Sequence, residues 1–374
     1  MQDVNVSNDI YPQNETEENI DNIQKSNSSS DITATPEIIS QVNLDSYTSG
    51  VRWSNTGDLC CVSTETRVHL YNYRDSFISY NSSIKHAECL YDRQCCDVDN
   101  SNMVVTTGRY QPVHLYKVHD NDISVESTYK CINHLDELSH AFSVSIDRDR
   151  SSVICGLKGE IRVFDINRPG RESMTFLTRG DAGQRGIISC IAVSPSIPVF
   201  AAGSYDKTVG LYSSEGERLC VLRGQQGGVT QVSFSEDGGC LLTGGRKDNE
   251  IICWDLRQPG HVLWTVNRVA ATNQTIGFSL RGRHLVSANT DGSVRVWDVS
   301  GHVDSSSGCL DPVCGWALHS DAVTGASWHP REDVLATSSG QRHCKLSTEY
   351  VEEEGKTISE ENCLVLWNVN DIFK

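Results

Sequence analysis

The sequence predicts an all-β fold, because one short unit recurs along the chain and helical periodicity is nearly absent. Each unit ends in an apolar strand that carries an aromatic residue, and the seven aromatics are Tyr71, Tyr116, Phe164, Tyr212, Trp254, Trp297 and Trp367. Their successive spacings are 45, 48, 48, 42, 43 and 70 residues. All but the last lie close to the period of roughly 40–45 residues that is typical of WD repeats. The chain is therefore predicted to form a seven-bladed WD-repeat β-propeller.

The fifth unit shows the four expected strands most clearly. Residues 227–235 alternate apolar and polar side chains, residues 240–245 are apolar, and residues 251–256 and 261–266 supply the third and fourth strands. A blade with two apolar faces is unstable alone and must stack on its neighbours in a ring. Residues 39–47 are expected to form the outer strand of the last blade, which joins the chain ends and removes an open edge.

The repeated tryptophans are interpreted as packing residues, because aromatics that recur in a stacked array belong to the core. Many WD repeats also place a Gly-His pair before the first strand, where the histidine joins a buried hydrogen-bonded network. His319 fits that position, but Gln226 replaces it in the fifth unit. Several blades are therefore expected to be held by packing alone.

The acidic residues are concentrated at two places in the chain. Residues 1–40 contain eight acids and one lysine with few aromatics, which predicts a short disordered acidic tail before the propeller at 41–374. Residues 349–361 contain six acids and one lysine, inside an acidic insert at about 343–362 in the last blade. These two stretches carry −12 of the net charge of −17. The acidic total therefore does not exclude a local basic face that binds nucleic acid.

The fifteen cysteines are scattered through a chain whose first residues lack the apolar region of a secretory signal. We expect reduced thiols, and no metal site, because pairs such as Cys60-Cys61 lack the Cys-x-x-Cys spacing of zinc ligands. No apolar run approaches the length of a membrane span, so no membrane association is expected.

No motif indicates catalysis or a cofactor. The segment that begins at Gly180 has three glycines but lacks the Lys-Ser/Thr ending of a phosphate-binding loop, and no nucleophile elbow occurs. The tract 319–323 contains His, Ser and Asp, but side chains so close in sequence rarely form a triad. We therefore expect a protein that is not an enzyme, binds no cofactor and is monomeric.

A candidate RNA-binding surface follows from the strand assignment. The loops between blades and those between second and third strands gather on one face, and loops of one face carry function in propellers. The candidates on this face are Arg179, Arg185, Tyr205, Lys207, Arg223, Arg246, Lys247, Arg268, Gln274 and Arg342. Side chains of these types hold phosphates and stack on unpaired bases. Composition alone also permits ordinary solvated loops.

Eight tracts in the same order resemble the telomerase Cajal body protein family. They lie at 133–138, 167–171, 186–195, 201–212, 226–230, 244–260, 272–278 and 336–342, and include AAGSYDKTVGLY and GGRKDNEIICWDLRQPG. The likeness runs from about Gly50 to Trp367 and is weaker in the first two blades.

The resemblance implies a WD-repeat scaffold that binds the CAB-box loop of small Cajal body RNAs and telomerase RNA. It also implies a nuclear protein, partly cytoplasmic, that docks on box H/ACA ribonucleoproteins, carries them to Cajal bodies and supports telomerase and telomere maintenance. Folding by a cytosolic chaperonin is a further implication, which suits slow non-local strand pairing. The short acidic tail and the insert depart from the family pattern, so the resemblance does not imply partners that a longer tail would recruit.

A different class of function is the substrate receptor of a cullin-RING ubiquitin ligase. This alternative is based on the tract Trp254-Asp255-Leu256-Arg257, which matches the short WDxR signature of such receptors. The pattern has one free position, and Trp-Asp is already expected here for packing. A scaffold that binds only proteins is the third reading.

Overall fold

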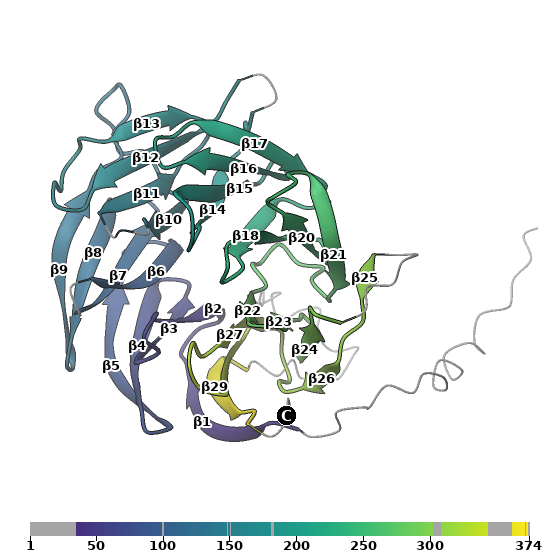
Figure 1. Ribbon diagram of the computed structural model, residues 1–374. Coiled ribbons are helices and arrows are strands. Elements are labelled where there is room, and N and C mark those ends of the chain that lie inside the picture. The colour runs from purple at the N-terminus through teal and green to yellow at the C-terminus, as the bar shows by residue number, and fades with distance from the viewer. Residues whose placement is uncertain are drawn as a thin grey trace, which may run out of the picture. The chain divides into compact units, whose positions relative to one another are not determined.

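The computed structural model describes residues 35–98, 101–147, 149, 151–180, 183–301, 308–342, 361–370 and 372, which lie in the unit Thr33–Lys374. These residues form strands and no helix. The described chain therefore contains no helix that could cross a membrane. Its strands make seven sheets, arranged as blades in a ring with the first strand of each blade innermost (Figure 1). The predicted seven-bladed propeller is confirmed.

Each blade is a four-stranded antiparallel meander that follows the chain outward. Blade 1 contains β2 (Thr48–Trp53), β3 (Leu59–Thr64), β4 (Arg67–Arg74) and β5 (Phe77–Lys85), and blade 2 contains β6 (Leu90–Val98), β7 (Ser101–Gly108), β8 (Val113–His119) and β9 (Asp122–Tyr129). Blade 3 contains β10 (Ser143–Ile146), β11 (Ser152–Gly156), β12 (Glu160–Asp165) and β13 (Met174–Leu177), and blade 4 contains β14 (Ile188–Val193), β15 (Val199–Ser204), β16 (Thr208–Ser213) and β17 (Arg218–Arg223).

The remaining blades follow the same plan with two differences. Blade 5 contains β18 (Val229–Phe234), β19 (Cys240–Gly245), β20 (Glu250–Asp255) and β21 (His261–Asn267), and blade 6 contains β22 (Phe278–Arg281), β23 (His284–Ala288), β24 (Ser293–Asp298) and β26 (Cys314–Ala317). Blade 7 contains β27 (Val323–Trp328), β28 (Val334–Ser339), β29 (Cys363–Asn368) and β1 (Glu37–Asn43). In blade 7 the fourth strand is β1, which comes from the other end of the described chain. Blade 5 has a fifth strand, β25 (Cys309–Leu310), which pairs parallel to β21. Strand β25 is not predicted by the sequence pattern.

The ring is closed by β1, which lies beside β29 (Figure 1). The pairing is antiparallel and runs from Glu37 opposite Asn368 to Asn43 opposite Cys363. The partly buried side chains of Ile39 and Val42 pack against the core between blades 7 and 1. The predicted outer strand of the last blade is therefore confirmed, although it starts at Glu37, inside the expected tail. Residues 1–34 of that tail, and 343–360 of the expected insert, lie outside the described residues.

The repeated aromatics occupy the third strand of every blade and pack in the core, as predicted, although Tyr116 is only partly buried. The side chains of Phe164 and Trp297 are fully buried, and Tyr212 and Trp254 are 1% and 3% exposed. Since each packs between its own blade and a neighbour, the hydrophobic clusters join adjacent sheets.

One cysteine pair departs from the expectation of reduced thiols. Cys61 of β3 and Cys95 of β6 face each other between blades 1 and 2 and are joined as a disulfide, with Cα atoms 7.3 Å apart. The sequence does not reveal this pair because its members lie on strands of different blades. The other cysteines in the described part of the chain are free thiols.

Candidate nucleic-acid interface

Loops of adjacent blades are tied together on one face of the ring. In blade 4, the turn between β15 and β16 holds Asp206, whose carboxylate accepts hydrogen bonds from the backbone N–H groups of Arg185 (2.7 Å) and Gly186 (3.1 Å). Arg185 lies in the loop that enters the same blade from blade 3. Turns between second and third strands therefore lie next to loops between blades, as the strand assignment predicts.

The most direct contact on this face joins blades 4 and 5. The guanidinium carbon of Arg246 lies 4.2 Å from the centroid of the Tyr205 ring, and Tyr205 is 37% exposed. The two residues occupy equivalent turns of neighbouring blades. A guanidinium stacked on an aromatic ring at the surface offers planar groups on which an unpaired base can stack.

The carboxylates of these turns accept hydrogen bonds from the backbone of neighbouring loops. Asp248 of blade 5 is 4% exposed and accepts hydrogen bonds from the backbone N–H groups of Gln226 and Gly227, both at 2.8 Å. Hydrogen bonds from Thr208 and from the Arg185 and Gly186 amides outweigh the effect of burial and lower the pKa of Asp206. Both acids fix the loops through these hydrogen bonds, while the lysines beside them, Lys207 and Lys247, are exposed.

We call the predicted residues that follow this face through blades 3 to 6 the basic arc: Arg179, Arg185, Tyr205, Lys207, Arg223, Arg246, Lys247 and Gln274. Five of its cations make no ion pair within the part of the chain that the structure describes: Arg179, Arg185, Lys207, Arg246 and Lys247. Uncompensated cations next to stacking groups suit the phosphates and bases of a single strand.

Neighbouring loops connect the members of the arc. Arg179 donates from Nη2 to the backbone carbonyl of Lys158 at 3.0 Å, which places it over the turn between β11 and β12. The Lys247 N–H donates to the carbonyl of Thr272 at 2.8 Å, in the loop that carries the half-buried Gln274. Lys207 and Lys247 both have positive φ, at 70° and 50°, in equivalent turns. The fold therefore repeats one way of presenting lysine in blades 4 and 5.

Two predicted residues lie away from the arc. Arg268 is only 2% exposed, and its guanidinium donates to the carbonyls of Ile276 (2.7 Å) and Gly245 (3.2 Å). Burial lowers the pKa of Arg268 to about 10. The predicted RNA contact of Arg268 does not belong to the exposed surface, because this guanidinium holds the backbone together beneath it. Arg342 is exposed in blade 7, 3.8 Å from the Glu65 carboxylate of blade 1, on a different part of the ring.

Glutamine replaces the expected histidine in a complete buried network of blade 5. Gln225 donates from Nε2 to the Asp248 carboxylate (2.9 Å) and accepts at Oε1 from the Thr243 hydroxyl (2.9 Å), which accepts from Trp254 Nε1 (2.9 Å). The position assigned to Gln226 thus belongs to Gln225, and blade 5 is not held by packing alone. In blade 6 the indole N–H of Trp297 is buried without a partner among the described residues, which agrees with that expectation for this blade.

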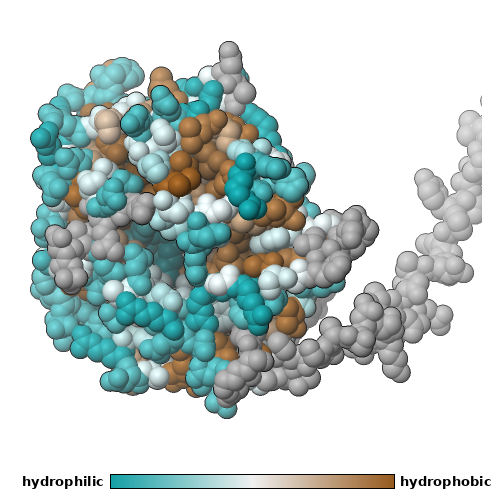
Figure 2. Space-filling model, viewed as in Figure 1, coloured by the Kyte–Doolittle hydropathy of each residue, from teal (hydrophilic) through white to brown (hydrophobic). Residues whose placement is uncertain are grey.

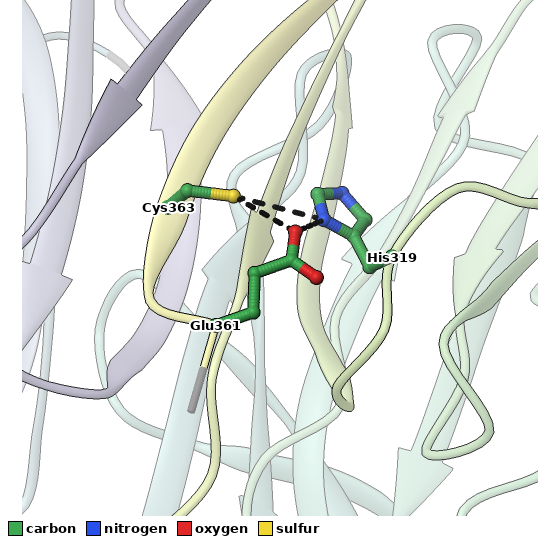
Figure 3. A group of neighbouring side chains, drawn as sticks. All are labelled: His319, Glu361 and Cys363. Carbon is green, nitrogen blue, oxygen red and sulfur yellow. Dashed lines mark hydrogen bonds and ion pairs between the residues drawn. The ribbon is translucent and has the colours of Figure 1, made fainter. Parts of the chain in front are cut away.

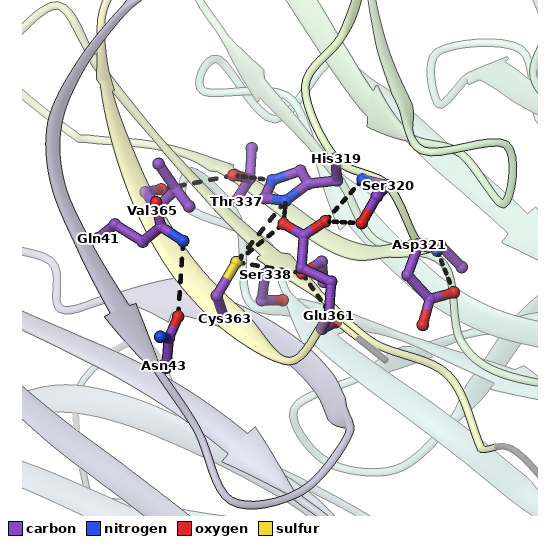
Figure 4. Close-up of polar contacts among 12 residues, drawn as sticks. Gln41, Asn43, His319, Ser320, Asp321, Thr337, Ser338, Glu361, Cys363 and Val365 are labelled. Carbon is purple, nitrogen blue, oxygen red and sulfur yellow. Dashed lines mark hydrogen bonds and ion pairs between the residues drawn. The ribbon is translucent and has the colours of Figure 1, made fainter. Parts of the chain in front are cut away.

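His319 builds the corresponding network in blade 7. Its Nε2 lies 2.8 Å from the Thr337 hydroxyl, which also accepts from Trp367 Nε1 at 2.8 Å. Its Nδ1 lies 2.7 Å from the Glu361 carboxylate. Figure 4 marks this contact with a dashed line. Glu361 lies at the far end of the long connection between β28 and β29 and takes the place that Asp248 has in blade 5. His319 therefore has the structural role that the sequence predicts.

The same cluster brings together three side chains of metal-binding type. Ligand atoms of His319, Glu361 and Cys363 lie within 4.8 Å of one another, and Figure 3 shows them converging. The Cys363 thiol donates to Glu361 at 3.2 Å, and burial raises the pKa of this thiol to about 12. Because every one of these polar groups has a hydrogen-bond partner, we assign the cluster to the blade network.

The pKa of Glu361 predicts how the stability of the protein changes at acid pH. Burial would raise the pKa of Glu361, but hydrogen bonds from Ser320 and His319 lower it from 4.5 to about 2. Its stabilising effect is therefore complete above pH 4.5 and is lost as the pH falls toward 2. Glu361→Gln should lower the melting temperature at pH 7, and the gap to the wild type should narrow in melts between pH 4.5 and 3. Glu126→Gln, on the exposed outer strand β9, is the matched control, and a gap that does not change with pH would contradict the assignment.

The WDxR tract lies on the other face of the ring. Arg257 follows β20, its guanidinium is 3.0 Å from the Asp255 carboxylate, and its side chain is 77% exposed. Asp255 also accepts the Arg257 backbone N–H at 2.9 Å, which closes the turn. The tract therefore has a structural explanation, and its exposed arginine is separate from the basic arc.

Comparison with known proteins gives a consistent result. The family model described as WD domain, G-beta repeat, matches residues 175–213, 216–255, 257–298 and 311–346. Telomerase Cajal body protein 1 of Mesocricetus auratus is 38% identical over 323 residues, which cover 81% of this chain and 60% of that protein. The Homo sapiens protein of the same name is 35% identical over 80% of this chain and 58% of its own length. The Drosophila melanogaster homolog is 32% identical over 64% of this chain and 43% of its own length.

The chain thus spans about three-fifths of the length of the first two relatives. The resemblance that the sequence motifs indicate is confirmed, over most of this chain.

Proposed function

This chain is a WD-repeat propeller of the telomerase Cajal body protein family, and we propose that it is a non-enzymatic RNA-binding scaffold. It binds CAB-box small Cajal body RNAs and telomerase RNA, directs their ribonucleoproteins to Cajal bodies, and supports telomerase assembly and telomere maintenance. The observation that carries the proposal is the basic arc, where Lys207 and Lys247, which make no ion pair within the described residues, lie in the same turns as the stacked pair Tyr205 and Arg246.

The partners and location follow from the same proposal. The protein docks on box H/ACA ribonucleoproteins and telomerase proteins, acts as a monomer in the nucleus and its Cajal bodies, and is partly cytoplasmic. A cytosolic chaperonin assists its folding, because the ring is complete only when β1 reaches β29, more than 300 residues away.

The arc suits a single-stranded loop better than a duplex. Lys207 and Lys247 project from tight turns whose acids are already bonded, so they are available to phosphates, while Tyr205 and Arg246 offer a stacking platform. Stacking tolerates any base, and phosphates carry no sequence. Discrimination among RNAs then depends on base edges, for which Gln274 lies at the end of the arc.

We expect replacement of Arg179, Arg185, Arg246 and Lys247 together by alanine to abolish crosslinking to small nuclear RNA. The change removes four phosphate contacts, and for a single strand the slope of log K against log salt should become less negative by about 0.7 for each, roughly 3 in total. The measurement combines RNA crosslinking and sequencing in cells with salt-dependent binding of a box H/ACA hairpin by the purified proteins.

A control with the same change in charge lies on the opposite face. Arg74, Arg168, Arg257 and Arg283 are exposed and each is paired with an aspartate, and their joint replacement by alanine should leave RNA binding intact. If the control loses RNA and the arc variant keeps it, the site lies elsewhere. Recovery of a ubiquitin-ligase adaptor without RNA would favour the receptor reading, for which Arg257 is the candidate contact.

A further inference from the structure

The central channel of the ring contains a buried arginine that the basic arc does not include. Inner strands of all seven blades line a cavity of about 710 Å³, and Figure 2 shows a recess within the ring. Its size falls within the roughly 300–1,000 Å³ of small-molecule sites. Arg52 of β2 and Arg93 of β6 both line it.

Arg93 is 6% exposed, and its charge is only partly offset by its neighbours. Its Nε has no hydrogen bond, and no ion pair involves its guanidinium, within the described residues. The neighbouring Asp92 carboxylate attracts Arg93 but makes no ion pair with it; its Oδ1 accepts from the Arg93 backbone N–H (2.8 Å) and its Oδ2 accepts from the Val144 N–H (3.0 Å). Gly50 lies beside the guanidinium, and a Cβ at this position would be 3.4 Å from Nη2.

A second guanidinium lies next to the first. Arg52 donates from Nη1 to the backbone carbonyl of Arg93 at 3.0 Å, and its Nη2 is 3.9 Å from Asp92. Burial, and then the charge of Arg52, outweigh the attraction of Asp92 and lower the pKa of Arg93 to about 9, which still leaves it charged at neutral pH. A buried cation beside another cation is strongly unfavourable unless an anion compensates it.

The charges along the channel indicate from which of its two mouths such an anion enters. Asp147 and Glu236 line the cavity just beyond the ends of β10 and β18, where inner strands lead into their first turns. These turns lie on the face opposite the basic arc. An anion is therefore repelled at that mouth, and it reaches Arg93 from the side of the arc.

We propose that Arg93, with Arg52, binds the phosphate group of a small ligand in the central channel. Guanidinium forks match the tetrahedral oxygens of phosphate and neutralise its charge. The ligand is either free phosphate or a phosphate ester. The site is independent of the proposed RNA binding, since it uses inner strands and none of the residues of the arc.

The test is calorimetric titration of the full chain with inorganic phosphate and with AMP, at constant ionic strength balanced by sodium chloride. We expect Arg93→Met to weaken binding by roughly tenfold or more, because it removes charge-assisted hydrogen bonds, and Arg52→Met to weaken it less. Tighter binding of AMP supports an ester site, and equal binding supports a free phosphate site. Arg74→Met removes the same charge from an exposed position and should leave binding unchanged.

Folding is checked separately by melts without phosphate. Arg93→Met should melt at or above the wild-type temperature, since it removes a buried charge that is only partly compensated. Arg93→Lys keeps the charge without the fork, and its weaker phosphate binding would support the site even if the methionine variant failed to fold. Failure of the wild type to bind either probe up to about 10 mM, or equal binding by Arg93→Met, would overturn the proposal. RNA crosslinking by the same variants distinguishes this failure from failure of the RNA-binding role.

Discussion

Removal of residues 1–43 is expected to deprive the propeller of most of its stability. The deletion removes β1, which pairs with β29 from Glu37 to Asn43, and it uncovers the apolar run of Leu364, Val365 and Leu366 as an edge strand. Lost strand hydrogen bonds and the burial of Ile39 and Val42 together amount to roughly 5 kcal/mol. That is a large part of the ~5–15 kcal/mol by which domains are stable. Thermal melts and gel filtration should show early unfolding and aggregation.

Deletion of residues 1–34 is the matched control, because it removes most of the acidic stretch and keeps β1 whole. We expect this variant to melt like the full chain, as the composition of the tail predicts. A soluble, monomeric chain from residue 44 that melts within a few degrees of the wild type would show that β1 does not hold the ring closed.

The sequence predicts the fold well because propeller strands carry a strong local signal. The aromatic in each third strand, such as Tyr71 or Trp367, repeats at nearly constant spacing up to the last blade, and each marks a strand of a different blade. Strand β25 could not be predicted, because a strand of two residues, Cys309 and Leu310, is too short to show a periodic pattern. The Cys61–Cys95 pair escapes because contacts between blades leave no trace in local pattern.

The candidate site is predicted less completely, because loop position follows from topology but side-chain direction does not. Lys207 and Lys247 are exposed where expected, whereas Arg268, in an equally polar loop, turns inward to bind two carbonyls. The stacking of Tyr205 on Arg246 joins residues 41 positions apart, and it depends on how two blades pack. The roles of Asp206 and Asp248 were missed, although their place in equivalent turns of successive repeats was a usable signal.

Thr243→Val is expected to destabilise the protein by about 2–4 kcal/mol, although it changes only a hydroxyl for a methyl group. Thr243 is fully buried and joins Gln225 to Trp254 through two hydrogen bonds of 2.9 Å. Valine keeps the volume but leaves the Gln225 carbonyl and the Trp254 indole N–H without partners. Each unsatisfied buried group costs ~1–3 kcal/mol. Denaturant unfolding followed by tryptophan fluorescence measures the loss.

Two substitutions separate the network from simple packing. Thr243→Ser keeps the hydroxyl and should recover most of the stability that valine loses. Ser287→Ala removes the hydroxyl at the same position of blade 6, where it bonds to the Ala288 carbonyl (2.9 Å) and the Trp297 indole N–H has no partner among the described residues. Since no network depends on that hydroxyl, its loss should cost less than about 1.5 kcal/mol. Equal losses for Thr243→Val and Ser287→Ala would mean that Gln225 does not replace histidine energetically, and that the blades are held by packing in both cases.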